Sequence, residues 1–445
     1  MLEARIRTLF TACCAVLFAA LSQNASAANL CVNPAGSGGC YKTIQSAVNH
    51  AAAFDVIRVA AGAYKEDILI GIPLSLIGAG ADRSFIDATG LPNGIFVDGY
   101  THPGLHAVTI AGFSVENAQY EGVLVVNASD VTIRENKVLD NDKFGPVFSP
   151  VASGCAGQPA FETDENGDCG GAIHLIGTVG AIVSGNWIIG NADGVLISDE
   201  TAPAHDNLLT KNNVVKNPLD CGIVLASHPP VGSAPPYFAP HFGIYHNTVV
   251  ENVSTDNGVQ VGGAGVGLFS DGNGPGRTSD NVIIHNTLSG NGIAGVALHT
   301  HVGPAFGAPA DNMDGNQIIG NTMWGNLADT DDTATPGTVG ININSGGGGS
   351  PVRGTIISGN TIWDEDVDIA VNTPASVDIH ENDLLGGQTG VANVCAFDHA
   401  ACTGGSDATE NYWGCATGPG GHGCTAVSGA NILYAPSLST SSTEF

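Results

Sequence analysis

Positively charged residues are scarce in this chain of 445 residues. It contains 13 Lys and Arg residues against 42 Asp and Glu residues, so the formal net charge at neutral pH is −29. A surface this acidic repels phosphate backbones and anionic lipid headgroups. The composition therefore argues against nucleic acid and anionic membrane surfaces as partners.

Long apolar runs and helical periodicity are also lacking. An apolar segment from Leu9 to Leu21 is too short to span a bilayer, and nothing later in the chain replaces it. Arg5 and Arg7 precede this segment and Ala25-Ser-Ala27 follows it, which is the pattern of a secretory signal peptide. We therefore expect residues 1–27 to be removed and the mature protein to be secreted or periplasmic. Beyond residue 60 no apolar repeat of 3.6 residues persists, which argues against a helical fold.

Eight short stretches share one pattern. Each opens on Gly or Asp, continues with aliphatic residues at alternate places and runs into small or polar residues: Gly122-Val-Leu-Val, Gly170-Gly-Ala-Ile-His, Gly194-Val-Leu-Ile-Ser, Gly222-Ile-Val-Leu-Ala, Gly265-Val-Gly-Leu-Phe, Gly295-Val-Ala-Leu-His, Gly340-Ile-Asn-Ile-Asn and Asp368-Ile-Ala-Val-Asn. Alternation of this kind is typical of a strand. Its repetition predicts a solenoid in which each repeat packs on the next.

A second series lies between these stretches and has an Asn flanked by aliphatic residues. Its members are Asn136, Asn186, Asn213, Asn247, Asn286, Asn321, Asn360 and Asn382. We expect these residues to stack at a turn, with each side-chain amide bonded to the next. The 22 residues from Asn360 to Asn382 are close to one coil of a parallel β-helix. The repeats therefore predict one elongated domain.

Eleven cysteines remain to be assigned. Cys13 and Cys14 lie in the predicted signal peptide, and Cys221 is left over, so we predict that it is a buried, inert thiol. The other eight form close sequence pairs, which in an exported protein indicate local disulfides: Cys31 with Cys40, Cys155 with Cys169, Cys395 with Cys402, and Cys415 with Cys424.

The N-terminal region contains a series of motifs that are similar to those of a known family. They are Thr43-Ile-Gln-Ser-Ala-Val, Val56-Ile-Arg-Val, Ala61-Gly-Ala-Tyr-Lys-Glu66, Leu76-Ile-Gly-Ala-Gly80 and Ile86-Asp87. Together with the repeats, they resemble the pectin-lyase-like right-handed β-helix superfamily over almost the whole mature chain. The resemblance implies an all-β, single-stranded, right-handed parallel β-helix. It implies little about activity, because that superfamily includes lyases, esterases, hydrolases, epimerases, adhesins and non-catalytic proteins.

The predicted organisation has four parts. A signal peptide occupies residues 1–27, an N-terminal cap and the first coils 28–80, the β-helix 81–394, and a disulfide-clamped cap 395–445. Within the first cap, residues 43–53 are predicted to form a helix that begins at Thr43 and covers the open edge of the first coil. Long insertions mostly follow the first strand of a repeat, and their stacking is expected to build the walls of a groove.

The site-like residues follow the ends of these strands. Four residues after the opening Gly or Asp lie His174, Ser198, Ala226, Phe269, His299, Asn344 and Asn372, and six residues after it lie Glu200, His228, Asp271 and His301. Adjacent coils are about 4.8 Å apart, so these groups can share a substrate. We predict His299, His301 and Asp271 as catalytic residues, and His174, Glu200, His228 and Asn344 as substrate contacts.

Other interpretations of this column of residues stay open. His228, Asp271, His299 and His301 have the donor types of a zinc or copper site, and a row of solvated polar residues would look the same. Asp164-Glu-Asn-Gly-Asp168 begins like a calcium loop but lacks the closing Glu, so Asp164 and Asp168 are predicted as ligands of an irregular Ca²⁺ site. The acidic runs around Asp329 and from Asp364 to Asp368 are further Ca²⁺ candidates.

The superfamily resemblance also defines what is missing. Its lyases typically use a Lys or Arg as the base beside a uronate carboxylate, so Arg277, in an insertion, becomes a candidate base. The paired-Asp motifs of its polygalacturonases and the motifs of its pectin esterases are absent. The Asn-rich repeats also resemble a periplasmic protein that helps to assemble a copper site in denitrifiers.

The sequence therefore predicts an exported, monomeric β-helix that binds a polysaccharide or oligosaccharide and modifies it as a lyase, hydrolase or epimerase. With so negative a surface, a neutral glycan is favoured unless Ca²⁺ bridges a polyuronate. The alternative is a non-catalytic periplasmic or surface scaffold, with or without a metal-handling role.

Overall fold

The structure is a computed structural model. It describes residues 27–142, 170–228, 242–270, 276–300, 303–330, 335, 337–346, 348–394 and 404–442. Within these ranges no helix is long and apolar enough to cross a membrane.

Three long parallel sheets run along the molecule, and a small fourth sheet lies beside them. The fourteen-stranded sheet contains β1 (Asn29–Val32), β2 (Asp55–Val59), β5 (Leu74–Gly78), β8 (Thr109–Ala111), β11 (Thr132–Arg134), β14 (Ile182–Ser184), β18 (Leu208–Thr210), β22 (Thr248–Val250), β26 (Val282–Ile284), β29 (Gln317–Ile319), β32 (Ile356–Ser358), β35 (Val377–His380), β38 (Ser406–Asp407) and β40 (Ile432–Leu433). The eleven-stranded sheet contains β3 (Gly62–Tyr64), β6 (Ser84–Asp87), β9 (Ser114–Glu116), β12 (Lys137–Leu139), β15 (Trp187–Ile189), β19 (Asn213–Val215), β23 (Val253–Thr255), β27 (Thr287–Ser289), β30 (Thr322–Trp324), β33 (Thr361–Trp363) and β36 (Asp383–Leu384).

The twelve-stranded sheet carries the repeats that open on Gly or Asp. Its strands are β4 (Ile68–Ile70), β7 (Ile95–Asp98), β10 (Val123–Val126), β13 (Ile173–Ile176), β16 (Val195–Ser198), β20 (Ile223–Ser227), β24 (Val266–Ser270), β28 (Val296–His299), β31 (Val339–Asn344), β34 (Val367–Asn372), β37 (Thr389–Asn393) and β39 (Ala426–Ser428). The small sheet joins β17 (Ala204–His205), β21 (Ile244–Tyr245) and β25 (Thr278–Ser279), and a single 3₁₀ turn, η1, spans Pro304–Phe306.

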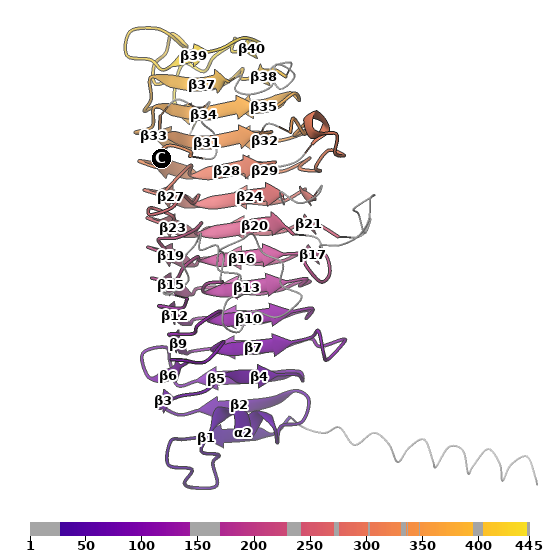
Figure 1. Cartoon of the computed structure of the whole chain (residues 1–445). Coiled ribbons are helices and arrows are strands. Elements are labelled where there is room, and N and C mark those ends of the chain that lie inside the picture. The colour runs from indigo at the N-terminus through magenta and orange to yellow at the C-terminus, as the bar shows by residue number, and fades with distance from the viewer. Residues whose placement is uncertain are drawn as a thin grey trace, which may run out of the picture.

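Each coil of the solenoid contributes one strand to each long sheet, so the chain passes from β14 through β15 to β16 and then begins the next coil at β18. The coils stack from the N-terminal to the C-terminal end (Figure 1). Two of the three strands come from the Asn-centred repeat, because the aliphatic residues on either side of each Asn belong to different sheets.

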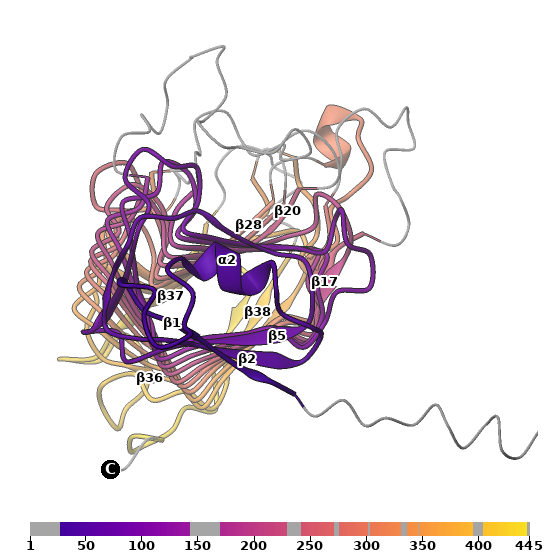
Figure 2. The same cartoon turned by 90° about the horizontal axis from the view of Figure 1, so that it is seen from below.

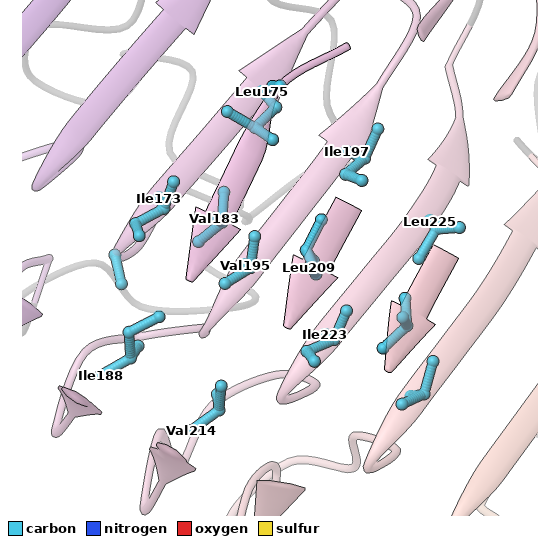
Figure 3. Close-up of a cluster of buried hydrophobic side chains, with 14 of the residues drawn as sticks. Ile173, Leu175, Val183, Ile188, Val195, Ile197, Leu209, Val214, Ile223 and Leu225 are labelled. Atoms are coloured by element: carbon cyan, nitrogen blue, oxygen red, sulfur yellow. The ribbon is translucent and has the colours of Figure 1, made fainter. Parts of the chain in front are cut away.

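The interior of the coil is a continuous apolar core. Ile173 and Leu175 from β13, Val183 from β14 and Ile188 from β15 are fully buried and point toward one another (Figure 3). Since side chains alternate along a strand, every second residue fills this core and the others face outward.

A short helix lies across the N-terminal end of the coil (Figure 2). Helix α2 (Ile44–Val48) starts at Thr43, whose side chain accepts the Ser46 N–H, and it ends five residues earlier than the predicted helix over 43–53. The Glu66 carboxylate accepts the first free N–H groups of α2, and the Gln45 amide bonds both backbone groups of Leu69. Leu69 lies in β4, the last strand of its sheet, so Gln45 satisfies an edge that would otherwise pair with another chain.

Stacked Asn side chains hold successive coils together. Asn286 donates its backbone N–H and its Nδ2 group to Oδ1 of Asn321, at 2.9 and 3.0 Å, and also donates Nδ2 to the Val249 carbonyl oxygen. The same bonds form one ladder at the corner between the fourteen-stranded and eleven-stranded sheets: Asn136, Asn186, Asn212, Asn252, Asn286, Asn321, Asn360, Asn382 and Asn411.

The predicted Asn row was wrong at two positions. Asn212, not Asn213, occupies the ladder, because Asn213 is the first residue of β19. Asn247 belongs to a second ladder at the entry to the fourteen-stranded sheet, with Asn207, Asn281 and Asn316. A third ladder, between the eleven-stranded and twelve-stranded sheets, contains Asn141, Asn191, Asn217, Asn257, Asn291 and Asn326.

The residue before each ladder Asn adopts a left-handed backbone conformation. Gly occupies this position before Asn186 and Asn321, but Lys211, Glu251 and His285 also have φ between 54° and 56°. A non-Gly residue in this region costs about 1 kcal/mol. The buried amide bonds of the ladder offset this cost, which explains how such varied residues occupy one tight corner.

The third ladder ends on an acidic residue. Glu365 takes the place of an Asn and accepts the N–H and Nδ2 groups of Asn326, both at 2.9 Å. Asp368 stands where the neighbouring coil has Gly340, and both of its carboxylate oxygens are buried. Burial raises the pKa of Glu365 to about 7 and the pKa of Asp368 well above its usual range. The charge of Asp364 adds to the rise at Glu365, and the charge of Glu365 adds to the rise at Asp368.

Two of the four predicted disulfides are present, Cys31–Cys40 and Cys415–Cys424. The pairs Cys155 with Cys169 and Cys395 with Cys402 lie outside the described residues. Cys221 is buried beside the twelve-stranded sheet, and its Sγ accepts the Ala264 N–H.

Replacing a ladder Asn should destabilise the coil far more than replacing its sequence neighbour. Asn212→Ala removes the side-chain bonds to Asn186 and Asn252 and leaves buried polar groups unsatisfied, so we expect a loss of about 2–4 kcal/mol in unfolding free energy. Asn213→Ala, at a partly exposed position, should change it by less than about 0.5 kcal/mol. Urea unfolding of both variants measures the difference, and equal losses would contradict the ladder assignment.

Glu365 should make stability fall as pH rises. Its pKa is raised in the folded protein, so the folded state keeps a proton that the unfolded chain releases, and stability is lost between about pH 4.3 and pH 7. Glu365→Gln should remove this loss, so its advantage in melting temperature over the native protein should grow from pH 5 to pH 8. Asp378→Asn, at an exposed position in β35, is the control and should follow the native pH profile.

Candidate functional site

The predicted site residues lie on the outer face of the twelve-stranded sheet. Ile197 and Leu298 point into the core, so Ser198 and His299, their neighbours in β16 and β28, point outward. One row on this face holds, in successive coils, Ile176, Ser198, Ala226, Phe269, His299, Asn344 and Asn372.

The structure corrects the place of His174 in this row. Its strand begins at Ile173, three residues after Gly170, whereas β16 begins one residue after Gly194. His174 therefore pairs in register with Leu196 rather than Ser198. The run of small residues before β13 caused the error, because Ala172 occupies the opening position that Gly fills in the neighbouring coils.

His174 is nevertheless hydrogen bonded to Ser198. The Glu121 carboxylate is 3.1 Å from His174 Nδ1, and His174 Nε2 is 2.8 Å from Ser198 Oγ. Glu121 is fixed by the Gly171 N–H, which it accepts at 2.9 Å. All three side chains of this chain of bonds are buried.

The chain of bonds continues into the next coils. Ser198 Oγ donates to Glu200 Oε2, and Glu200 Oε1 lies 3.5 Å from His228 Nδ1. The backbone N–H of His228 and the hydroxyl of Ser227 donate to the two oxygens of Asp199. Glu121, His174, Ser198, Glu200 and His228 thus form one buried polar chain, which we call the Glu121–His228 chain.

The order carboxylate, imidazole and hydroxyl is that of a serine nucleophile with its base. Ser198 differs from such a nucleophile in two ways. Its hydroxyl is completely buried, and a carboxylate, Glu200, lies where an attacking oxygen would develop negative charge. The geometry therefore suits proton transfer through Ser198 better than attack by Ser198.

Burial makes the Asp199 carboxyl group a weaker acid than usual. Burial and, to a smaller extent, the charge of Glu200 raise the pKa of the Asp199 carboxyl to about 7, against the opposing effects of Ser227 and His228. A carboxyl group with this pKa exchanges protons near neutral pH, which is what acid–base chemistry requires.

A second group of polar residues surrounds His299. Its Nε2 is 3.0 Å from Asp329 Oδ2, which also accepts the Asn342 side chain at 2.8 Å, and the His299 ring packs against Phe269. The His299 and Asp329 side chains are almost completely buried. Asn344 lies beside them in the next coil and accepts the Asn372 amide at 3.1 Å.

The candidate base Arg277 is held by other partners. Its guanidinium lies 4.1 Å above the Tyr245 ring and donates Nε to Ser279, and Asp280 lies 3.6 Å away. Tyr245 stacks on His205 on its other face, along the small sheet. A guanidinium in this setting stabilises the small sheet. Among the described residues, Arg277 contacts the site through its backbone N–H, which donates to Ser227 Oγ.

The other predicted residues are not all placed. His301, Asp271, Asp164 and Asp168 lie outside the described residues. The structure brings His174, Glu200 and His228 together and keeps His299 apart from them. Among the residues that are described, no group of three or more His, Cys, Asp or Glu residues could hold a metal ion.

Sequence reasoning missed Glu121, Asp199 and Asp329 as site residues. Glu121 directly precedes the opening Gly122, and Asp199 lies between the two positions at which site residues were predicted. Asp329 was considered only for Ca²⁺. A signal for Glu121 existed, since an acid beside the opening Gly faces the next coil, but its pairing with His174 depends on the corrected register.

The neighbours of Asp199 should control its titration. Glu200→Gln removes an adjacent negative charge and should lower the Asp199 titration midpoint from about 7, whereas Ser227→Ala removes a hydrogen bond to the carboxylate and should raise it. Carbon-13 NMR of labelled Asp side chains measures both shifts. Shifts in the opposite directions would contradict the described contacts.

Comparisons with known proteins bear on the fold. Residues 89–234 match the family described as right handed beta helix region. No significant match was found among curated protein sequences.

Three solved structures illustrate the similarity. The catalytic unit of the thermostable GH87 α-1,3-glucanase from Streptomyces thermodiastaticus strain HF3-3 has a TM-score of 0.53 and 14% identity, covering 95% of this chain and 72% of that one. An alginate lyase from Paenibacillus sp. str. FPU-7 has a TM-score of 0.49 and 14% identity, covering 72% and 92%. The A-module of a mannuronan C-5 epimerase from Azotobacter vinelandii has a TM-score of 0.46 and 14% identity, covering 89% and 94%.

The family match, the three parallel sheets and the similarity to the glucanase along nearly the whole chain agree. The chain is therefore a right-handed parallel β-helix protein, as its opening motifs and its repeats predicted.

Proposed function

We propose that this protein is exported and that it binds a polysaccharide along the outer face of the twelve-stranded sheet and modifies it by acid–base chemistry. One observation carries the proposal: three histidines on this face each pair with a carboxylate. The pairs are Glu121 with His174, Glu200 with His228, and Asp329 with His299. General acid–base catalysis commonly uses pairs of titratable groups in a buried setting.

The arrangement of the pairs favours a polymer over a small metabolite. They follow the axis of the solenoid from β13 to β28, four coils apart and thus about 19 Å. A linear glycan aligned with this axis contacts several coils at once. The insertions that follow these strands would supply the walls of its groove.

The charge and the fold neighbours support the choice of substrate class. A net charge of −29 favours a neutral glycan over a polyuronate, unless Ca²⁺ bridges the two. The solved structure with the TM-score of 0.53 is an α-1,3-glucanase, which supports a polysaccharide as partner. Lyase, hydrolase and epimerase chemistry all use a positioned acid and base.

The burial of the pairs favours a second candidate function, a non-catalytic scaffold. The side chains of the three histidines are 0%, 9% and 3% exposed, in the order His174, His228 and His299. In that case the pairs stabilise the face and the protein binds a glycan, or a metal in its insertions, without a reaction. The two candidates differ in whether a product forms.

A panel of neutral and uronate polysaccharides distinguishes the two candidates. Products are followed by mass spectrometry and by the absorbance of unsaturated uronates, and binding by affinity electrophoresis. With one glycan we expect a product, and we expect His228→Ala and His299→Ala to lower its rate by at least about 100-fold. His422→Ala, at an exposed position in the C-terminal region, is the control and should leave the rate unchanged.

Each other outcome decides between the candidates. Binding without a product from any glycan would establish the scaffold and overturn the enzyme. Neither binding nor a product would overturn both the enzyme and the glycan-binding scaffold.

A further inference from the structure

We infer that Ser198 relays a proton between His174 and Glu200. Glu200 then works as an acid–base group whose proton is replaced from the buried His174. The catalytic part of this inference rests on the proposed function, but the relay itself does not. Its geometry is the Glu121–His228 chain, in which hydrogen bonds connect Glu121 to Glu200 and a 3.5 Å contact joins Glu200 Oε1 to His228 Nδ1.

The hydroxyl of Ser198 is the single link between two carboxylate–histidine pairs. It lies 2.8 Å from His174 Nε2 on one side and bonds Glu200 Oε2 on the other. A hydroxyl can donate one hydrogen bond while accepting another, so it passes a proton on without changing its own charge. Neither a carboxylate nor an alkyl group at this position could do so.

One carboxylate oxygen of Glu200 forms no hydrogen bond with the described residues. Its Oε2 bonds Ser198, but its Oε1 is buried without a hydrogen-bond partner and faces His228 at 3.5 Å. Leaving a buried carboxylate oxygen unsatisfied costs free energy. A purely structural Glu would be expected to use both oxygens, so Oε1 marks the place where a proton or a substrate hydroxyl completes the site.

Burial limits the access of water to the chain. Glu121, His174, Ser198 and Glu200 are each at most 2% exposed, so bulk water does not reach their bonds directly. His228, at 7%, is the most exposed member and lies at the Glu200 end of the chain. Protons that enter or leave at that end can therefore be stored at His174, where Glu121 stabilises the imidazolium.

The transfer balances without any added reactant. In one state His174 is protonated on both nitrogens: Nδ1–H donates to Glu121, Nε2–H donates to Ser198, and the Ser198 hydroxyl donates to ionised Glu200. In the other state the Nε2 proton has moved to Ser198 Oγ while the original Ser198 proton has moved to Glu200. His174 is then neutral, Glu121 remains ionised and Glu200 is a neutral acid.

The charges around the chain favour keeping this proton. Asp199 lies beside Glu200 and His228, and the Asp193 carboxylate lies against Gly171, which bonds Glu121. Within the described residues, no Lys or Arg forms an ion pair with any member of the chain. A proton held by this chain offsets part of the repulsion among these carboxylates.

Histidine NMR tests the relay without any substrate. In the full-length protein with nitrogen-15 histidine, Glu121→Gln should change the protonation of His174 and, through Ser198, move the His228 titration by about one pH unit. In a Ser198→Ala background the same change should move His228 by less than a third as much. Signals are assigned with His174→Asn and His228→Asn, and thermal melting verifies folding.

A matched variant separates the relay from ordinary electrostatics. Ser198→Thr keeps the hydroxyl and should show the coupling of the native protein. A direct Coulomb interaction would instead give the same coupling in the Ser198→Ala protein as in the native one. Equal coupling with Ala and Thr would overturn the relay. If the Ser198→Thr protein does not fold, equal coupling in the native and Ser198→Ala proteins would likewise overturn the relay.

Activity provides an independent second readout. With a glycan from the panel, Ser198→Ala should lower kcat at least tenfold with KM unchanged, and Ser198→Thr should recover most of the rate. If the coupling depends on the Ser198 hydroxyl but no glycan gives a product, the relay stands and the proposed function is overturned. A normal kcat in a Ser198→Ala variant that has lost the coupling would overturn the catalytic part of this inference alone.

Discussion

Every coil of this protein turns several corners, and each corner brings backbone N–H and C=O groups into an interior that water does not reach. The asparagine ladders satisfy these groups. A ladder Asn bonds the amide of the Asn in the next coil and a backbone carbonyl of the coil before it, so its polar atoms are used completely. The same bonds hold each coil in register with the next, and every row of side chains on the surface depends on that register.

The outer face of the twelve-stranded sheet shows what this register makes possible. Residues that are unremarkable alone become partners when coils stack: Glu121 meets His174 across 53 positions of sequence, and His299 meets Asp329 across a long insertion. Alternation along β13 and β28 leaves His174 and His299 outside the apolar core, while the Glu121–His228 chain is itself buried.

The scarcity of Lys and Arg shapes the electrostatics of the whole molecule. With 13 basic residues against 42 acidic ones, few buried carboxylates can be neutralised by a Lys or Arg. Histidines, hydroxyl groups and protons take that role instead. The raised pKa values of Asp199, Glu365 and Asp368 share this origin, since burial favours the neutral acid wherever no cation is near. Protonation near neutral pH is thereby connected with both the candidate site and the end of a ladder.

Most of the architecture was predictable from the sequence. Alternating aliphatic residues located strands such as Val195–Ser198 and Ile223–Ser227, and Thr43 was correctly placed before the helix. These features are local, since a strand or a cap depends on neighbours a few residues away. The site was predictable only as residue types on one face, because His174, Glu200 and His228 were identified but their order and their partners were not.

The remaining features depend on which coil lies against which. The sequence offers Asn212 and Asn213 side by side, and only the stacked corners select Asn212, because its neighbour must begin a strand. It offers several acids near His174, and only the register brings Glu121 to its Nδ1 and Ser198 to its Nε2. The sequence by itself determined the repeat, the core face and the acidity. The tertiary structure decided the pairings, because hydrogen bonds between coils depend on distances that sequence spacing does not contain when insertions vary in length.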